Sequence, residues 1–253
     1  MSMNTIDSLI KKHKALSKGQ IDYRKYAYYA LTHHSTSIEG STLTESQVIN
    51  LLEYGKPAAN KPFEHHQMVF DHFRALVAVV EWAEAKVSLS PLLIQQMGAR
   101  VMKNTGSVVN SMGGNFDVSA GEFRLCSVRA GTRTFPNYLK VPQLIKRFCE
   151  EINEGIKTSK TPQQQLELSF KAHFDFVSIH PFGDGNGRTS RLLMNYIQAY
   201  FGLPMGLVFK QNRIGYINAL EAARNAEDIA PFYDFMFKQY EKFLKHEIEE
   251  MSR

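Results

Sequence analysis

Twelve consecutive residues, 180 to 191, combine side chains that could handle a phosphate and a proton. They read His-Pro-Phe-Gly-Asp-Gly-Asn-Gly-Arg-Thr-Ser-Arg. The three glycines let backbone N–H groups converge on a bound oxyanion without a Cβ in the way, which is how proteins build anion-binding nests. An apolar run with helical spacing follows. The glycine turn is therefore predicted to lead into a helix N-terminus, where the helix dipole also favours a phosphate.

Four side chains of this segment have roles that follow from their chemistry. His180 lies just before the glycines, and an unperturbed pKa of about 6.5 suits a general base. Asp184 indicates a divalent cation, most simply Mg²⁺ bridging phosphate oxygens. Arg188 and Arg191 are three residues apart and would share one face of the first helical turn. Taken singly, a turn-forming aspartate or a structural histidine would explain as much, but the combination at this spacing favours a phosphate site.

Two further residues of the segment have mainly structural interpretations. Phe182 is assigned to the core, as an anchor that lets the loop turn while its neighbours face a ligand. Asn186 could orient a phosphate or cap the helix, and capping alone would explain an asparagine at this position.

The segment resembles a known family motif at every position. The Fic family motif is His-x-Phe-x-Asp/Glu-Gly-Asn-Gly-Arg-x-x-Arg, and residues 180–191 match it throughout. Residues 176–179 are similar to its usual lead-in, residues 121–124 with 128–131 resemble the family's β-hairpin flap, and residues 213–225 resemble its adenine-side segment. The resemblance covers most of the chain and implies an all-α, mainly helical Fic fold with a small β-hairpin flap.

The activity implied by the resemblance is transfer of AMP from ATP to a Tyr, Thr or Ser hydroxyl of a target protein. His180 would deprotonate that hydroxyl, and Asp184 would hold Mg²⁺ against the α- and β-phosphates. The amides of residues 185–187 would stabilise charge on the α-phosphate, and the two arginines would hold the outer phosphates. The residues expected at the nucleotide are Val128, Arg129, Ala130, Gly131, Asp184, Gly185, Asn186, Gly187, Arg188, Thr189, Arg191, Tyr216 and Asn225.

The matches on the flap and the adenine side carry further expectations. The flap, residues 122–136, would cover the nucleotide and pair with an extended stretch of the target protein. Tyr216 and Asn225 look like adenosine contacts, although their match needs a one-residue gap near Arg224. A half-buried helix tyrosine explains Tyr216 nearly as well.

A second constellation lies upstream, where residues 35–40 read Ser-Thr-Ser-Ile-Glu-Gly. By itself it is a helix that ends at a C′ glycine. Acidic residues are disfavoured at the negative end of a helix, so Glu39 is expected to have a cationic partner elsewhere. The residues Ser35, Glu39 and Gly40 resemble the inhibitory signature Ser/Thr-x-x-x-Glu-Gly/Asn of Fic proteins. The resemblance implies that Glu39 pairs with Arg191, excludes the γ-phosphate and holds the enzyme off, or positions a water that removes AMP from a modified target.

Composition and charge limit which partners and which cellular location we expect. The chain has 253 residues, is 43% hydrophobic and carries a formal net charge of +5. Its basic residues are dispersed, so we expect no nucleic-acid partner. It has no apolar run near the roughly 20 residues needed to span a bilayer and no signal-peptide h-region, so we expect a cytoplasmic protein without membrane contact. Two cysteines without metal-like spacing fit a reducing compartment. Relatives add a homodimer as a further expectation.

Helices are expected nearly throughout. Residues 1–60 are predicted to form a helical extension that carries the inhibitory helix, and residues 61–253 the Fic domain. Thr44–Gln47 and Thr161–Gln164 fit capping boxes, and Ser90-Pro91 is a similar helix start. Residues 63–86 form a long apolar-periodic stretch. A stripe near the C-terminus is assigned to the core; its members are Phe232, Met236, Tyr240 and Phe243.

Three features are harder to interpret: an alternating segment, a hairpin and a cluster of histidines. Residues 166–176 alternate apolar and polar side chains as a strand would, but the capping box and the resemblance favour a helix. The only strand pair predicted is the hairpin around residues 122–136. The cluster His65, His66 and His72 is interpreted as surface or core histidines rather than a metal site.

Two other functional hypotheses stay open. One is a Fic-fold transferase of another group, such as UMP, phosphate or phosphocholine, against which the intact Arg188 and Arg191 argue. The other is a nucleotide-binding interaction protein without turnover, which would be expected to have lost His180 or Asp184. The sequence retains both.

Overall fold

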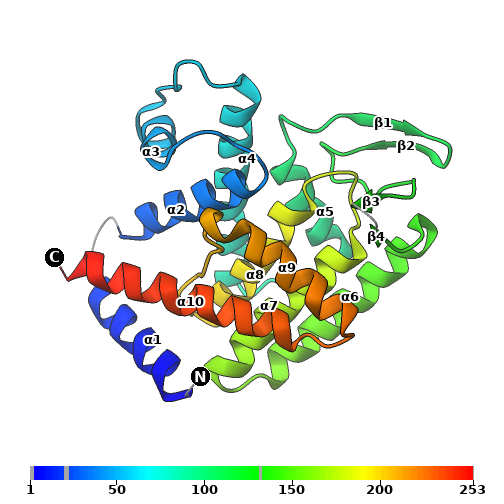
Figure 1. Cartoon of the computed structure of the whole chain (residues 1–253). Coiled ribbons are helices and arrows are strands. Elements are labelled where there is room, and N and C mark those ends of the chain that lie inside the picture. Colours follow the sequence, from blue (N-terminus) through cyan, green and yellow to red (C-terminus); the bar gives the residue numbers. More distant parts are fainter. Residues whose placement is uncertain (1–2, 20–22, 131–132, 253) are drawn as a thin grey trace.

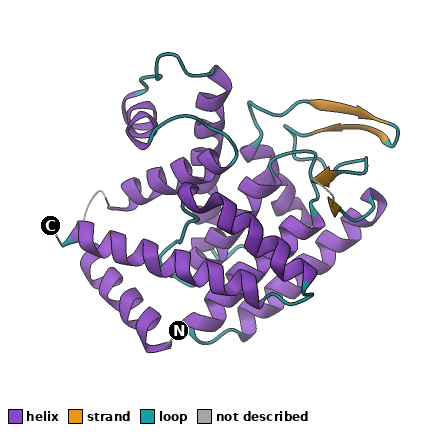
Figure 2. Cartoon of the chain, in the orientation of Figure 1, coloured by secondary structure: helices purple, strands orange, loops and turns teal. Residues whose placement is uncertain are grey.

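The computed structural model describes residues 3–19, 23–130 and 133–252, and helices make up most of it (Figures 1 and 2). The mainly helical fold is the predicted one. The helices are α1 (Met3–Ser17), α2 (Tyr23–Ile38), α3 (Glu45–Tyr54), α4 (Phe63–Glu84), α5 (Pro91–Val101), α6 (Val141–Thr158), α7 (Pro162–Ile179), α8 (Asn186–Tyr200), α9 (Arg213–Asn225) and α10 (Ala230–Met251), with 3-10 turns η1 (Tyr138–Lys140) and η2 (Lys210–Asn212).

The predicted helix starts are confirmed. Thr44 and Thr161 each accept a hydrogen bond from the backbone N–H of the third helical residue, and the glutamine at that position closes the capping box. Ser90 caps α5 in the same way, with Pro91 at the first helical position. The ambiguous segment 166–176 lies within α7, where Leu166, Phe170 and His173 are buried at helical spacing. Satisfied N-terminal amides therefore outweighed the strand-like alternation.

Helix α8 is the centre of the molecule. It packs against α7, α4 and α5, and every residue from Arg188 to Gln198 is buried. A helix that is enclosed on all sides must lie inside the protein. Its first turn, which carries the second half of the 180–191 segment, is therefore fixed by packing from several neighbours.

The N-terminal helices are arranged around this centre. Helix α1 runs along α10, α2 packs on α4, and α3 closes a small satellite cluster with α4. On α10 the predicted core stripe is confirmed, because Phe232, Met236, Tyr240 and Phe243 are all buried. No helix in the described ranges is long and apolar enough to cross a bilayer.

The strands form two small hairpins at one edge of the molecule (Figure 2). The expectation of a single strand pair is wrong, because β1 (Val108–Ser111) pairs antiparallel with β2 (Gly114–Asp117) through a turn at residues 112–113. The Gly113-Gly114 pair, where that turn meets β2, is a hairpin signal that the sequence reasoning missed. The expected hairpin around residues 122–136 is present only as β3 (Arg129–Ala130) and β4 (Arg133–Thr134).

Buried histidines give the fold a predicted sensitivity to acid. Burial lowers the pKa of His33 and of His180 to about 4, and that of His34 to about 3. These rings are neutral in the native protein, whereas the unfolded chain binds protons below pH about 6.5. The contribution of these neutral rings to the free energy of unfolding is thus fully present above pH 6.5. It is lost as the pH falls toward the pKa of the folded state, by up to about 1.4 kcal/mol per pH unit for each such histidine.

Urea unfolding at a series of pH values measures this effect. We expect the free energy of unfolding to fall steadily between pH 6.5 and 5. Replacing His34 with asparagine, whose side-chain oxygen can still accept the Lys210 N–H, should reduce the slope. A free energy that stays constant down to pH 5 would contradict the assignment of neutral buried rings.

Candidate active site

The 180–191 segment forms the turn between α7 and α8. His180 ends α7 in a left-handed conformation, with φ 54°, and its N–H donates to the Phe176 carbonyl. Gly185 precedes α8 with φ 78°, a backbone conformation that favours glycine. The N-terminus of α8 is therefore presented directly after the general-base candidate, as the sequence predicted.

Phe182 and Asn186 hold the loop in shape. Phe182 is 1% exposed, which confirms its assignment as the anchor. The side-chain amide of Asn186 accepts from the Phe182 N–H and donates to the Phe182 carbonyl, both at 3.0 Å. The amide thus closes the loop on itself and makes no helix-capping bond. Of the two roles expected for Asn186, capping is wrong, and its side chain is already occupied.

The glycines of the loop lie against other elements. A Cβ on Gly183 would come within 2.9 Å of the Phe116 ring of β2. A Cβ on Gly187 would collide with the carboxylate of Glu39. Glycine is thus required at position 187 because Glu39, the residue that follows α2, approaches it closely. It also leaves the backbone amides of the loop uncovered by a side chain.

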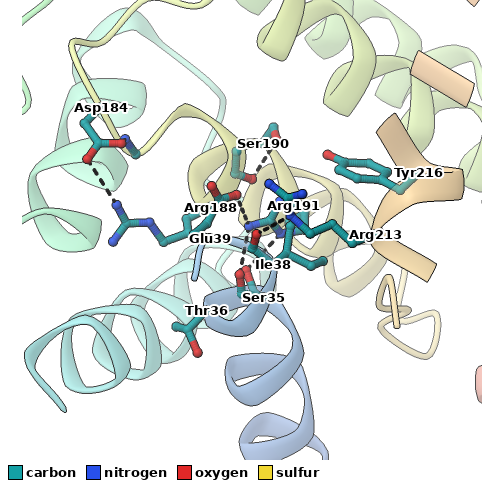
Figure 3. Close-up of polar contacts among 12 residues, drawn as sticks. Ser35, Thr36, Ile38, Glu39, Asp184, Arg188, Ser190, Arg191, Arg213 and Tyr216 are labelled. Atoms are coloured by element: carbon teal, nitrogen blue, oxygen red, sulfur yellow. Dashed lines mark hydrogen bonds and ion pairs between the residues drawn. The ribbon is translucent and has the colours of Figure 1, made fainter. Parts of the chain in front are cut away.

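Arg188 and Arg191 are buried at the start of α8 and their guanidinium groups point to different partners (Figure 3). Arg188 lies 3.7 Å from the Asp184 carboxylate and 3.0 Å from the Met102 sulfur. Its Nε and Nη1, and Nη1 of Arg191, have no hydrogen-bond partner among the described residues. Burial lowers the pKa of Arg188, a cost that a bound anion would offset.

Glu39 contacts Arg191, the arginine expected from the sequence. The carboxylate accepts from Arg191 Nη2 at 2.7 Å, and Ser35 completes the contact by accepting from Nε through its hydroxyl at 2.9 Å (Figure 3). Although burial opposes ionisation, the adjacent guanidinium holds the pKa of Glu39 below its usual range. Gly40, with φ 105°, ends the helix, as predicted.

Arg213 holds the end of α2 from another direction. Its Nε donates to the Ile38 carbonyl at 2.8 Å. This bond satisfies one of the C-terminal carbonyls of the helix. The segment that carries Glu39 is therefore attached to both α8 and α9.

His180 is held as a neutral imidazole. Its ring stacks on Phe135 with a centroid distance of 3.9 Å and an interplanar angle of 18°. Nδ1 lies 3.4 Å from the Val177 carbonyl. Burial lowers the pKa of His180 to about 4. The ring can therefore accept a proton at neutral pH, which a general base must do.

Asp184 suits a cation that arrives together with a nucleotide. Its side chain is 72% exposed, and Oδ1 accepts from the Gly185 N–H at 2.5 Å. No group of three or more His, Cys, Asp or Glu side chains among the described residues could hold a metal ion alone. Mg²⁺ characteristically binds one or two carboxylates together with substrate phosphates and water. A single exposed carboxylate beside two buried arginines fits that mode.

The flap residues are only partly placed by the structure. The Val128 carbonyl accepts from the Phe135 N–H at 3.3 Å, and Ala130 pairs with Arg133 across the small hairpin. Arg129 is exposed. Gly131, which was also expected at the nucleotide, lies outside the described residues.

Three other predicted contacts differ in their surroundings. Tyr216 is buried on α9, and its hydroxyl lies 2.8 Å from Nε2 of His173. Asn225, at the end of α9, is exposed. Thr189 is fully buried within α8 and its N–H is used by the Gly185 carbonyl. Its hydroxyl has no hydrogen-bond partner among the described residues, and its contact with a nucleotide stays a prediction.

The structure adds neighbours of the site that the sequence did not reveal. Phe135 covers the His180 ring, Met102 supports Arg188, and the Arg124 side chain reaches the backbone of His180. Arg124 belongs to a segment that was identified as part of the flap, but nothing in the sequence assigned it a task. A single phenylalanine, methionine or arginine carries no spacing signal of its own.

Comparison with known proteins identifies related sequences. Residues 88–198 match the Fic/DOC family. The chain is 32% identical over 222 residues to the Protein adenylyltransferase Fic of Drosophila willistoni, and the same figures hold for that of Drosophila melanogaster. Each alignment covers 87% of this chain and 42% of the relative. The chain thus spans about two fifths of the length of these curated relatives.

Solved structures resemble the whole chain. A Fic domain containing signaling protein from Bacteroides thetaiotaomicron superposes with a TM-score of 0.82 at 22% identity, covering 98% of this chain and 97% of the other. Fic-1 from C. elegans superposes with a TM-score of 0.78 at 25% identity, covering 98% of this chain and 72% of the other. The first likeness concerns the fold alone.

Proposed function

Because this chain belongs to the Fic/DOC family, we propose that it is a protein adenylyltransferase, a nucleotidyltransferase that moves AMP from ATP to a Tyr, Thr or Ser hydroxyl of a target protein. The observation that carries the proposal is the set of unpaired guanidinium nitrogens on Arg188 and Arg191 at the N-terminus of α8, directly after a neutral His180. Buried donors without partners favour a polyanionic ligand.

The proposed reaction assigns a role to each of these groups. His180 accepts the proton of the target hydroxyl, whose oxygen forms a bond to the α-phosphorus as the bond to the β-phosphate oxygen breaks and pyrophosphate leaves. Of the backbone amides of residues 185–187, those of Asn186 and Gly187 at the start of α8 stabilise charge on the α-phosphate, because the Gly185 N–H is bonded to Asp184, and Arg188 with Arg191 bind the outer phosphates. Asp184 would hold Mg²⁺, which neutralises phosphate charge when bound.

We further propose that the resting protein is inhibited in cis. Glu39 occupies Nη2 of Arg191, whose guanidinium would bind the γ-phosphate, and its carboxylate approaches Gly187 closely. ATP would then bind in a pose unsuited to in-line attack. The same carboxylate could position a water for removal of AMP from a modified target.

The remaining elements have proposed roles of their own. The flap at residues 122–136 would dock an extended segment of the target. Residues 1–60 would act as the inhibitory extension of a Fic domain at 61–253. A homodimer and a cytoplasmic location stay predictions from the sequence.

Incubation with labelled ATP tests the transferred group. We expect label from the α-phosphate, together with the adenosine, to appear on protein when Glu39 is replaced by glycine. Label from the γ-phosphate should appear only in released pyrophosphate. Transfer of γ-label alone would mean that the chain is a phosphotransferase and would refute AMP transfer.

A further inference from the structure

Arg124 is the most completely enclosed charged side chain of the described residues, at 0% exposure. It lies in the part of the flap that precedes β3, and its side chain donates to three backbone carbonyls. Nε donates to the His180 carbonyl at 2.8 Å, Nη1 to that of Cys126 at 2.7 Å, and Nη2 to that of Pro136 at 2.6 Å. Its backbone N–H donates to the Pro181 carbonyl at 2.9 Å.

These four bonds join the two parts of the site. Cys126 and Pro136 flank the β3–β4 hairpin of the flap, and His180 and Pro181 begin the 180–191 segment, here called the phosphate loop. One side chain thus fixes where the flap starts, where it returns and where the loop begins. Helices and hairpins do not supply these bonds, because all the acceptors lie on irregular backbone.

Phe135 of the flap stacks on the ring of His180. Phe135 directly precedes Pro136, whose carbonyl Arg124 binds, while His180 is held through its own carbonyl by the same guanidinium. The backbone segments that carry the two stacked rings, whose centroids are 3.9 Å apart, are therefore bonded to the same buried cation. We propose that Arg124 is a positioning residue that fixes the imidazole of His180 for proton transfer by tying both ends of the flap to the start of the phosphate loop.

The chemistry of arginine explains why this residue is charged. A guanidinium has a rigid, planar set of donors that reaches three carbonyls in different directions, whereas lysine presents one flexible nitrogen. Among the described residues no ion pair with a carboxylate involves Arg124, so its desolvation is offset only by carbonyls. Such a buried cation is costly for stability alone, which favours a role in organising the site.

The test compares Arg124→Gln and Arg124→Lys in the full chain carrying Glu39→Gly. The inference rests on the proposed function, so two readouts are needed. We expect kcat for AMP transfer to fall about 100-fold, the loss associated with a displacement near 1 Å, while KM for ATP changes little because Arg188 and Arg191 are untouched. We also expect the His180 pKa, followed by NMR, to rise toward 6.5 as the ring is released from its burial.

Asn153→Ala is the matched control. Asn153 bonds the N–H and carbonyl of Leu89, 64 positions away in sequence, and neither residue belongs to the flap or to the phosphate loop. Its loss should lower the melting temperature without moving kcat or the His180 titration. The His180 signal is assigned from its absence in His180→Gln, and Arg124→Lys replaces Arg124→Gln if the latter folds poorly.

The outcomes separate the two proposals. An unchanged His180 titration in both Arg124 variants, with kcat equal to that of Asn153→Ala, would overturn the role of Arg124. If the parent Glu39→Gly protein transfers no AMP, the proposed function fails, and the titration alone decides Arg124. A shifted titration then supports the positioning role at His180, and an unchanged one rejects it.

Discussion

Replacing Glu39 with glycine is expected to raise AMP transfer by about 10- to 100-fold, the range typical of coupled sites. The substitution frees Nη2 of Arg191 from its 2.7 Å contact. The guanidinium is then available to the γ-phosphate, and ATP can adopt the pose for in-line attack. Because the carboxylate also lies against Gly187, its removal opens the loop itself.

Intact-mass measurement after incubation with ATP and Mg²⁺ detects the change as an added AMP on the protein. Binding offers a second readout, since ATP should raise the melting temperature of Glu39→Gly more than that of the parent. Glu53→Gly is the matched control, because Glu53 on α3 also forms a 2.7 Å ion pair, with Lys25 on α2. Equal automodification in the parent and in Glu39→Gly would mean that α2 is not inhibitory.

Replacing His180 with alanine is expected to reduce transfer by about 10²- to 10⁴-fold, the usual contribution of a general base. ATP binding should change little, because the imidazole makes no hydrogen bond to Arg188 or Arg191. The measurement is initial rate and ATP affinity in the Glu39→Gly background. His246→Ala, at an exposed position on α10, is the control, and full activity of His180→Ala would remove His180 as the base.

The pH profile gives an independent check on His180. Burial lowers its pKa to about 4, so the base is neutral, and competent, from pH 8 down to about 5. We expect kcat/KM, which reports on the free enzyme, to stay level on the acid side over that range. An acid limb with a midpoint near 6.5 would indicate an ordinary, exposed histidine instead.

Much of the chemistry could be predicted because it is local in the chain. Residues 180–191 place the base, the carboxylate and both arginines within a turn and the first turns of a helix. A left-handed residue, a glycine and a helix start suffice to present them. The capping residues Thr44, Ser90 and Thr161 were readable for the same reason, since each satisfies amides only a few positions away.

The hairpins were less predictable. The expected flap strands are two residues long, and Arg124 holds the surrounding backbone in their place. The longer β1–β2 hairpin was overlooked although Gly113-Gly114 marked it. Asn186 was expected to orient a phosphate or to cap the helix, but its amide bonds to the backbone of Phe182 four positions earlier, a contact that depends on how the loop turns.

By itself the sequence determined the composition of the site, because the types and spacing of residues 180–191 dictate a phosphate loop with a base. It also indicated that Glu39, at the negative end of a helix, needs a cation. The resemblance implied that this cation is Arg191, and only the tertiary structure decided the geometry around these residues: the 2.7 Å contact between Glu39 and Arg191, the Phe135 ring on His180 and the Arg124 bonds that join flap and loop. These contacts connect segments up to 152 positions apart, and they form only when the helices pack around α8.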